Sequence, residues 1–370
     1  MKSLLYMQIL TSEARTRHWQ QIKQAFYQDK LLYGYVLFTT IALYLMSLMF
    51  SYASHIEYSA FTYLSTLIRI CYITFLTWSS AYYLYLLYHR RPHPIQVYIK
   101  TLIGFFNPLS KAISFILLVL ALNLTYSCYS YLKSVIPDIK PFQYDLAFYE
   151  LDKWLHFGVS PWEITHGIFS SPFATYGINF LYHLWFLLMW GMTLFFIVRR
   201  DLTHLRNQYL IAYMSSWLLI GGITATLLSS AGPCYTHLLN PEHTHYLPLI
   251  DLLNDQSRIM VEAGWFPVWA LDVQDTLWLN YLGREGGIGA GISAMPSMHV
   301  SVAMLMALAS YQYNKKLGLL MWAYMIFIQI SSVHLAWHYA IDGYLSIILT
   351  LLIWKGCGWI SHRLTSEPSQ

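Results

Sequence analysis

The chain has 370 residues, of which 56% are hydrophobic and only 11% are charged, and its formal net charge at pH 7 is +4. A water-soluble core of ordinary size cannot bury so much apolar surface, so the composition excludes an ordinary soluble domain. We expect an all-α integral membrane protein whose partner is the bilayer, with no nucleic-acid partner.

Apolar stretches long enough to span a bilayer as helices recur along the chain, because a span needs about 20 residues. Residues 1–30 precede them and are too polar for a secretory signal, with Arg15, Arg17, Lys23 and Lys30 among them. We predict about eight spans, the last six forming the catalytic bundle. The predicted spans are 31–50, 69–88, 112–132, 176–198, 207–230, 293–312, 317–336 and 338–357.

The basic residues predict the orientation, since Lys and Arg resist translocation when they flank short loops. With the N-terminus inside, most of the 22 Lys and Arg residues lie in the cytoplasm. The long connections 133–175 and 231–292 are then outside, where Gly, Pro and aromatic residues suggest ordered caps. We expect a bacterial inner-membrane protein with both termini cytoplasmic and an active site on the periplasmic side.

Four regions follow from this threading. We predict a cytoplasmic N-terminal arm at 1–30 and a transmembrane pair with its cytoplasmic loop at 31–110. A catalytic six-helix domain at 111–357 and a cytoplasmic tail at 358–370 complete the chain.

Two polar segments near the C-terminal end lie at the predicted outer ends of apolar spans. One is Pro296-Ser297-Met298-His299, which we expect to place His299 about one and a half turns into its span. The other runs from His338, at the start of the eighth span, to Asp342 four residues later, which on a helix is one turn away on the same face. A carboxylate at one imidazole nitrogen fixes the tautomer and leaves the other nitrogen free to attack. His299 could then donate a proton to a departing oxygen, while Ser297 and the helix start supply donors for an anion, which points to phosphoryl transfer.

These two segments resemble the second and third motifs of the phosphatidic acid phosphatase type 2 superfamily. The resemblance covers roughly 140–355 and implies metal-independent chemistry through a phosphohistidine, with no cofactor. Two further segments, at 151–158 and 231–235, are similar to the branch of inositol phosphorylceramide synthases and their bacterial relatives.

The resemblance is incomplete at the residues that bind phosphate. The third motif usually carries Ser-Arg seven and six residues before its histidine, but here those positions are Ser331 and Ser332. Another cation must replace the arginine, and the candidates for substrate binding besides Ser297 are Arg284, Arg258 and Lys153.

The predicted function is therefore a membrane phosphoesterase acting on a phosphorylated lipid. It is a lipid phosphatase if water is the acceptor, and a head-group phosphotransferase if a lipid or polyol hydroxyl is the acceptor. The alternatives are an inactive lipid-binding or transport protein and a membrane di-iron oxidase, for which His334 and His338 offer too few ligands. We expect no bound metal, because Leu335 stands where a zinc-protease pattern needs glutamate.

Overall fold

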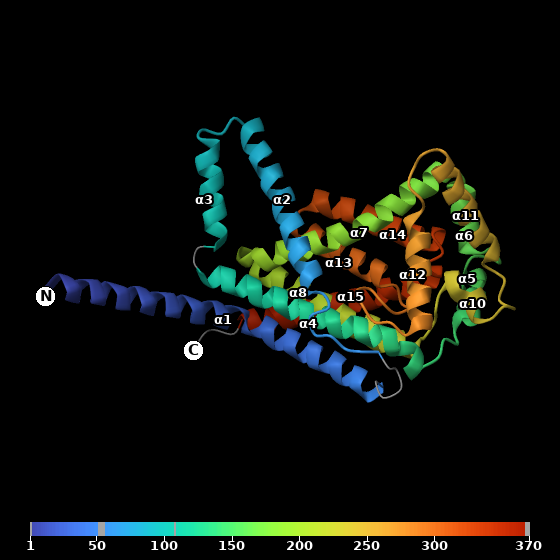
Figure 1. Ribbon diagram of the computed structural model, residues 1–370, viewed down its shortest axis with the longest axis horizontal. Helices are drawn as coiled ribbons and strands as arrows, with labels where there is room; N and C mark the ends of the chain where they lie inside the picture. The colour runs from blue at the N-terminus through green and yellow to red at the C-terminus, as the bar shows by residue number, and fades with distance from the viewer. Residues whose placement is uncertain (1, 51–55, 107–108, 367–370) are drawn as a thin grey trace.

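The structure of the chain is a computed structural model, and it describes residues 2–50, 56–106 and 109–366 (Figure 1). No strand occurs among these residues, so the prediction of an all-α fold is confirmed. The longer helices are α1 (Lys2–Phe50), α2 (Leu64–Tyr88), α4 (Leu109–Ile139), α7 (Pro172–Val198), α8 (Thr203–Leu218), α13 (Met298–Tyr313), α14 (Lys315–His334) and α15 (Ala340–Ser366). The shorter helices are α3 (Pro94–Phe106), α5 (Asp145–Leu155), α6 (Pro161–Ile168), α9 (Ala225–Leu227), α10 (Thr236–Leu239), α11 (Leu247–Glu262) and α12 (Trp269–Gly283).

Seven helical segments in the described part of the chain are long and apolar enough to cross a membrane, and each overlaps one of the predicted spans. One of them, Arg200–Leu227, joins α8 to α9 through a π-helical turn at Leu219–Thr224. The chain is thus an integral, multi-pass membrane protein. The predicted span 293–312 is the one that none of these seven segments overlaps, and its predicted start at residue 293 is wrong. Its helix, α13, begins only at Met298 and has 16 residues. Ser297 is its N-cap, because the Ser297 hydroxyl oxygen accepts a hydrogen bond from Val300 N at 3.4 Å.

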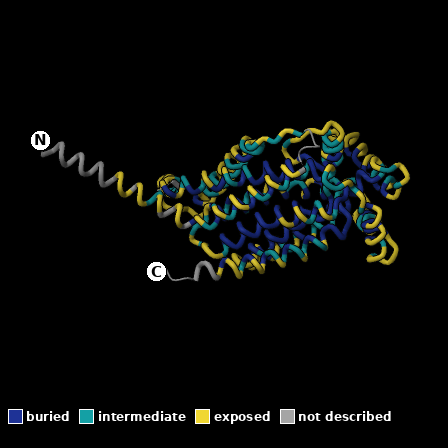
Figure 2. The backbone as a smooth tube through the Cα atoms, turned by 90° about the horizontal axis from the view of Figure 1, so that it is seen from below, coloured by how far each residue is buried: buried dark blue, intermediate teal, exposed yellow. Residues whose placement is uncertain are grey.

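α13 is apolar because it packs inside the protein. Its residues from Val300 to Ala307 are buried on every side of the helix. Figure 2 shows the buried backbone running through the middle of the bundle, with exposed backbone around it. A central helix and a lipid-facing helix have similar hydropathy, and this is why the sequence did not separate them.

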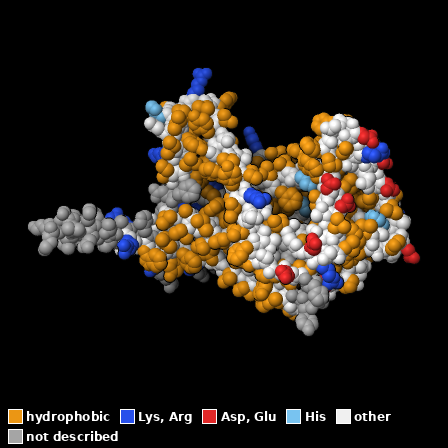
Figure 3. Space-filling view, in the orientation of Figure 1, with side chains coloured by type: hydrophobic (Ala, Val, Ile, Leu, Met, Phe, Trp, Pro, Cys, Tyr) orange, Lys and Arg blue, Asp and Glu red, His pale blue; other side chains and the backbone are white. Residues whose placement is uncertain are grey.

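The two long connections fold into short helices. α5 and α6 belong to the first connection, and α10, α11 and α12 belong to the second. Together they form a cap at one end of the bundle (Figure 1). Acidic side chains gather at this end, while apolar side chains cover much of the bundle surface (Figure 3). The prediction that both connections are ordered is therefore confirmed.

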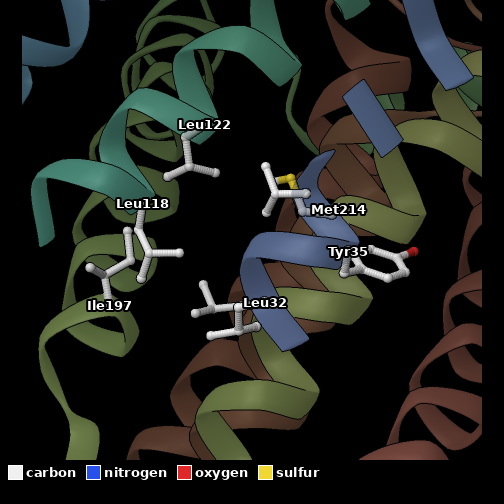
Figure 4. A pocket seen from close by; sticks show the side chains of 8 residues that line it. Leu32, Tyr35, Leu118, Leu122, Ile197 and Met214 are labelled. Atoms are coloured by element: carbon white, nitrogen blue, oxygen red, sulfur yellow. The ribbon is translucent and has the colours of Figure 1, made fainter. Parts of the chain in front are cut away.

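A small cavity lies where α1, α4, α7 and α8 meet (Figure 4). Its volume is about 10 Å³, enough for at most a single water molecule, and its lining is almost wholly apolar. It is a gap in the packing between helices and too small for a lipid or substrate. The residues that line it are Leu32, Tyr35, Val36, Leu118, Leu122, Ile197, Leu210 and Met214.

A buried ion pair fixes α1 to the rest of the bundle. α1 is one continuous helix through the predicted arm and first span, and it packs along α4. Asp29 Oδ1 lies 2.8 Å from Arg206 Nη1 on α8, and both side chains are almost completely buried. Ser114 on α4 donates a hydrogen bond to the same carboxylate. Three helices therefore meet at Asp29.

Replacing Asp29 with Ala should leave the Arg206 charge buried without its closest partner. We expect the free energy of unfolding to fall by roughly 3–5 kcal/mol, measured as a lower melting temperature in detergent. The matched control is Asp201→Ala, which breaks a pair with Arg199 in which Asp201 is 62% exposed. That change should cost less than about 1 kcal/mol. Equal losses in the two variants would contradict a structural role for the buried pair.

Candidate active site

The His338 and Asp342 side chains are in contact at the start of α15. Asp342 Oδ2 lies 3.0 Å from His338 Nδ1 and also accepts a hydrogen bond from Tyr339 N at 3.1 Å. α15 begins at Ala340, so His338 does not begin the helix as predicted but lies in the loop before it. The contact arises because a carboxylate in the first turn of a helix turns back toward the chain that enters it. His338 is 7% exposed and Asp342 is fully buried.

His299 faces this pair from α13. The predicted depth of one and a half turns is wrong, because Ser297 caps the helix and His299 is its second residue. The His299 and His338 ring centroids are 6.2 Å apart. On its other side His299 is enclosed by α7, where the rings of Tyr182 and Trp185 lie 4.9 Å and 4.3 Å away. Trp185 Nε1 also donates a hydrogen bond to the His299 carbonyl oxygen at 3.0 Å.

Backbone hydrogen bonds join the three loop segments around the histidines. Ser297 N donates to the Asp342 carbonyl oxygen at 3.2 Å, which connects the starts of α13 and α15. Ala294 N donates to Ser230 O at 3.0 Å, and Cys234 N donates to Ala336 O at 3.2 Å. The segments 230–234, 294–297 and 336–342 therefore form one unit.

Gly232 allows these segments to approach closely. Its φ is +100°, and a Cβ atom there would lie 2.9 Å from Ala294 Cβ and 3.0 Å from the Trp337 carbonyl oxygen. Both the positive φ and the short distances exclude a larger residue.

Two aspartates of α5 hold this unit from the cap side, and the sequence did not reveal their role. Asp152 accepts hydrogen bonds from Ala340 N at 2.7 Å and Ile341 N at 2.9 Å. Asp145 accepts bonds from the backbone N–H groups of Ala231 and Gly232, and from the Tyr339 hydroxyl at 3.0 Å. The only signal in the sequence is their spacing of seven residues, which puts both on one face of a helix.

The charges around the site shift several pKa values. Burial raises the pKa of Asp152 to about 6, although the two backbone bonds oppose the shift. Burial also raises the pKa of Asp145. For His338, burial and then the positive charge of Lys133 lower the pKa to about 3. The His338 imidazole is therefore neutral at pH 7, as a nucleophile must be.

The cationic residues proposed for substrate binding lie on the cap. Arg284 is the C-cap residue directly after α12, and its Nη1 is 3.5 Å from Asp138 Oδ1 in a polar pocket of about 240 Å³. Arg258 on α11 is 63% exposed and pairs with Asp255 and Glu262. Lys153 Nζ on α5 lies 5.4 Å above the Tyr149 ring. None of these contacts of Arg284, Arg258 and Lys153 involves His299 or His338.

Lys133 is a further residue that sequence reasoning missed. The predicted spans put Lys133 in the outer connection 133–175, but α4 continues to Ile139 and carries Lys133 in its last two turns. Its charge acts on His338, as described above. The sequence does contain a signal for Lys133, namely a lysine at the end of an apolar segment, because ionisable residues at membrane depth are often functional.

The neighbour of the His334 ring is His166, and not His338, with which it would have to pair to bind a metal. Its ring stacks on His166 of α6 with centroids 3.7 Å apart, and its Nε2 lies 2.9 Å from Thr175 Oγ1. Across the described residues, no three His, Cys, Asp or Glu side chains form a group that could hold a metal ion.

Comparison with known proteins gives the family. A sequence model of the PAP2 superfamily matches residues 146–355, which is more than half of the chain. This all-helical membrane protein, with a His–Asp pair facing a second histidine, belongs to the PAP2 superfamily. That membership suggests a membrane enzyme of the phosphatase or phosphotransferase type. No curated protein and no solved structure matches the chain.

The raised pKa of Asp152 predicts a pH dependence of stability. An ordinary aspartate has a pKa of about 3.9, so the folded protein keeps this proton to a higher pH than the unfolded chain does. The contribution of Asp152 to the free energy of unfolding should therefore decrease by roughly 3 kcal/mol as the pH rises from about 4 to above 6.

The test compares melting temperatures of the wild type and Asp152→Asn between pH 4 and 7. The wild type should lose more stability than the variant as the pH rises. Glu150→Gln, an exposed change on the same helix, should follow the wild-type curve. Parallel curves for the wild type and Asp152→Asn would contradict the shifted pKa.

Proposed function

We propose that this protein is a membrane phosphoesterase that acts on a phosphorylated lipid through a phosphohistidine intermediate. The observation that carries the proposal is the buried pair of His338 Nδ1 and Asp342 Oδ2, 3.0 Å apart, with the His299 ring facing it. A carboxylate at Nδ1 holds the proton on that nitrogen and leaves the lone pair of Nε2 available for attack.

The reaction has two halves. His338 Nε2 attacks phosphorus, and a P–N bond forms while the P–O bond to the lipid breaks. His299 gives a proton to the departing oxygen, and Asp342 stabilises the positive charge on His338. His299 then takes a proton from an acceptor hydroxyl, whose oxygen attacks phosphorus and releases His338. The start of α13, capped by Ser297, contributes the positive end of the helix dipole.

The molecule that accepts the phosphoryl group from His338 determines which of two reactions the enzyme catalyses. Water gives a lipid phosphatase, and a lipid or polyol hydroxyl gives a phosphotransferase, because the first half-reaction is common to both. The resemblance to the inositol phosphorylceramide synthase branch favours the transferase, whereas hydrolysis is the wider activity of the superfamily. Arg284, Arg258 and Lys153 stay predictions for substrate binding.

The roles of the three residues predict the effects of single changes on turnover. His338→Ala should abolish turnover, because no other group attacks phosphorus. Asp342→Asn should lower kcat by several orders of magnitude, as the loss of an orienting acid does in other triads. His89→Ala, at an exposed histidine on the helix-end turn after α2, is the matched control and should act as the wild type. Near wild-type rates in His338→Ala, with an unchanged melting temperature, would refute the mechanism.

The products identify the reaction. Purified protein is incubated with phospholipids, prenyl phosphates and ceramide in the presence of EDTA, and the products are resolved by mass spectrometry. Free phosphate identifies a hydrolase, and an exchanged head group identifies a transferase. Turnover that stops with EDTA and returns with zinc or magnesium would refute metal independence. Binding of a lipid with no product would favour the inactive lipid-binding alternative.

We also propose that both termini lie in the cytoplasm and that the site faces the outer leaflet. The distribution of Lys and Arg supports this orientation. In a Cys71→Ser background, Arg258→Cys should react with a membrane-impermeant thiol reagent in intact cells. Lys315→Cys should react only after lysis. The native cysteines at 128, 234 and 357 are buried and should not react with the reagent. Labelling in the opposite order would invert the topology and move the reaction to the cytoplasmic leaflet.

A further inference from the structure

We infer that Lys133 of α4 binds the phosphoryl group of the substrate and replaces the arginine that the third motif lacks. The inference rests on the proposed function, since it assigns a role at the same site. Lys133 lies outside the residues that match the family model, 146–355.

The packing of α4 brings this lysine to the histidines. Tyr129 lies one turn before Lys133 on the same face of the helix. A Cβ atom on Gly221 would lie 2.8 Å from Tyr129 Cε2 and 3.1 Å from Met298 Sδ, so Tyr129 and Met298 meet at this glycine. Met298 is the residue directly before His299. The face of α4 that carries Lys133 therefore borders the first turn of α13.

The loop that leads into α13 lies on α4 at Lys133 itself. A Cβ atom on Gly291 would lie 2.6 Å from the Lys133 carbonyl carbon and 2.7 Å from its oxygen. Gly291 also has a φ of +87°, so both space and backbone conformation require glycine there. This contact fixes the position of Lys133 relative to Ser297, six residues further along the loop.

The Lys133 side chain has no anionic partner among the residues that the structure describes. The buried aspartates around the histidines accept hydrogen bonds from other groups: Asp145 and Asp152 from backbone N–H groups, and Asp342 from His338. Lys133 is half-buried, so a ligand could reach it. A cation without a partner in such surroundings is costly unless a bound anion supplies the opposite charge.

A phosphoryl group fits this arrangement. It carries negative charge on several oxygens, and an ammonium group stabilises that charge as a point charge. The same cation lowers the pKa of His338 and so keeps the attacking imidazole neutral. One residue can therefore hold the substrate and prepare the nucleophile.

The test uses orthophosphate as the probe and the full chain in detergent. Thermal stabilisation by orthophosphate is measured for the wild type, Lys133→Met, Lys133→Arg and the control Lys111→Met. Lys111 is an exposed lysine near the other end of α4. Lys133→Met should weaken orthophosphate binding at least about tenfold, as for the loss of one charge-assisted bond, and the Arg variant should retain most of it.

Two further readouts separate binding from a structural role. Without phosphate, Lys133→Met should melt at or above the wild-type temperature, because an uncompensated charge has been removed. With dioleoyl phosphatidic acid as substrate, the acid limb of its pH–rate profile should move to higher pH, since the pKa of His338 rises when the nearby charge is lost.

The outcomes also separate this inference from the proposed function. Wild-type orthophosphate affinity in Lys133→Met, or a large fall in its melting temperature without phosphate, would overturn the role of Lys133. Activity that survives in His338→Ala would instead refute the phosphohistidine mechanism, while the orthophosphate measurement would still decide whether Lys133 binds phosphate.

Discussion

The arrangement of the loops that carry His299 and His338 depends on two buried carboxylates of α5, those of Asp145 and Asp152. Asp152 binds the first two N–H groups of α15, and Asp145 binds the 231–232 backbone and the Tyr339 hydroxyl. A carboxylate offers several acceptor positions, so two side chains can hold segments that are far apart in the sequence. The helix N-terminus also favours a negative charge at Asp152. These bonds offset part of the cost of burying two acids.

The two histidines are held in different ways. His338 is oriented by a carboxylate, whereas His299 is held between aromatic rings of α7 and has its backbone bonded to Trp185. The Asp342 carboxylate fixes the orientation and tautomer of the His338 ring, and the aromatic rings of α7 limit the movement of His299 without adding charge. This asymmetry supports the roles that we propose for them, His338 as nucleophile and His299 as proton donor.

Much of the fold could be predicted from the sequence, because a membrane helix needs an apolar run of a certain length whatever its neighbours are. The contact of His338 with Asp342 follows from their spacing, although the backbone between them is a helix start. The start of α13 could not be predicted, since protein-facing and lipid-facing helices are equally apolar. The proposed role of Lys133 and the backbone contacts of Asp152 depend on which helices pack together, and spacing within one segment carries no such information.

The length of α13 has a consequence for how the candidate site is completed. At 16 residues the helix is too short to be a stable span alone, and Asn314 is the only residue between it and α14. The two helices therefore form one helical hairpin, in which α13 packs along the longer apolar helix α14. Because His299 lies in the first turn of α13, the candidate site is complete only when this hairpin packs against α7, α8 and α15.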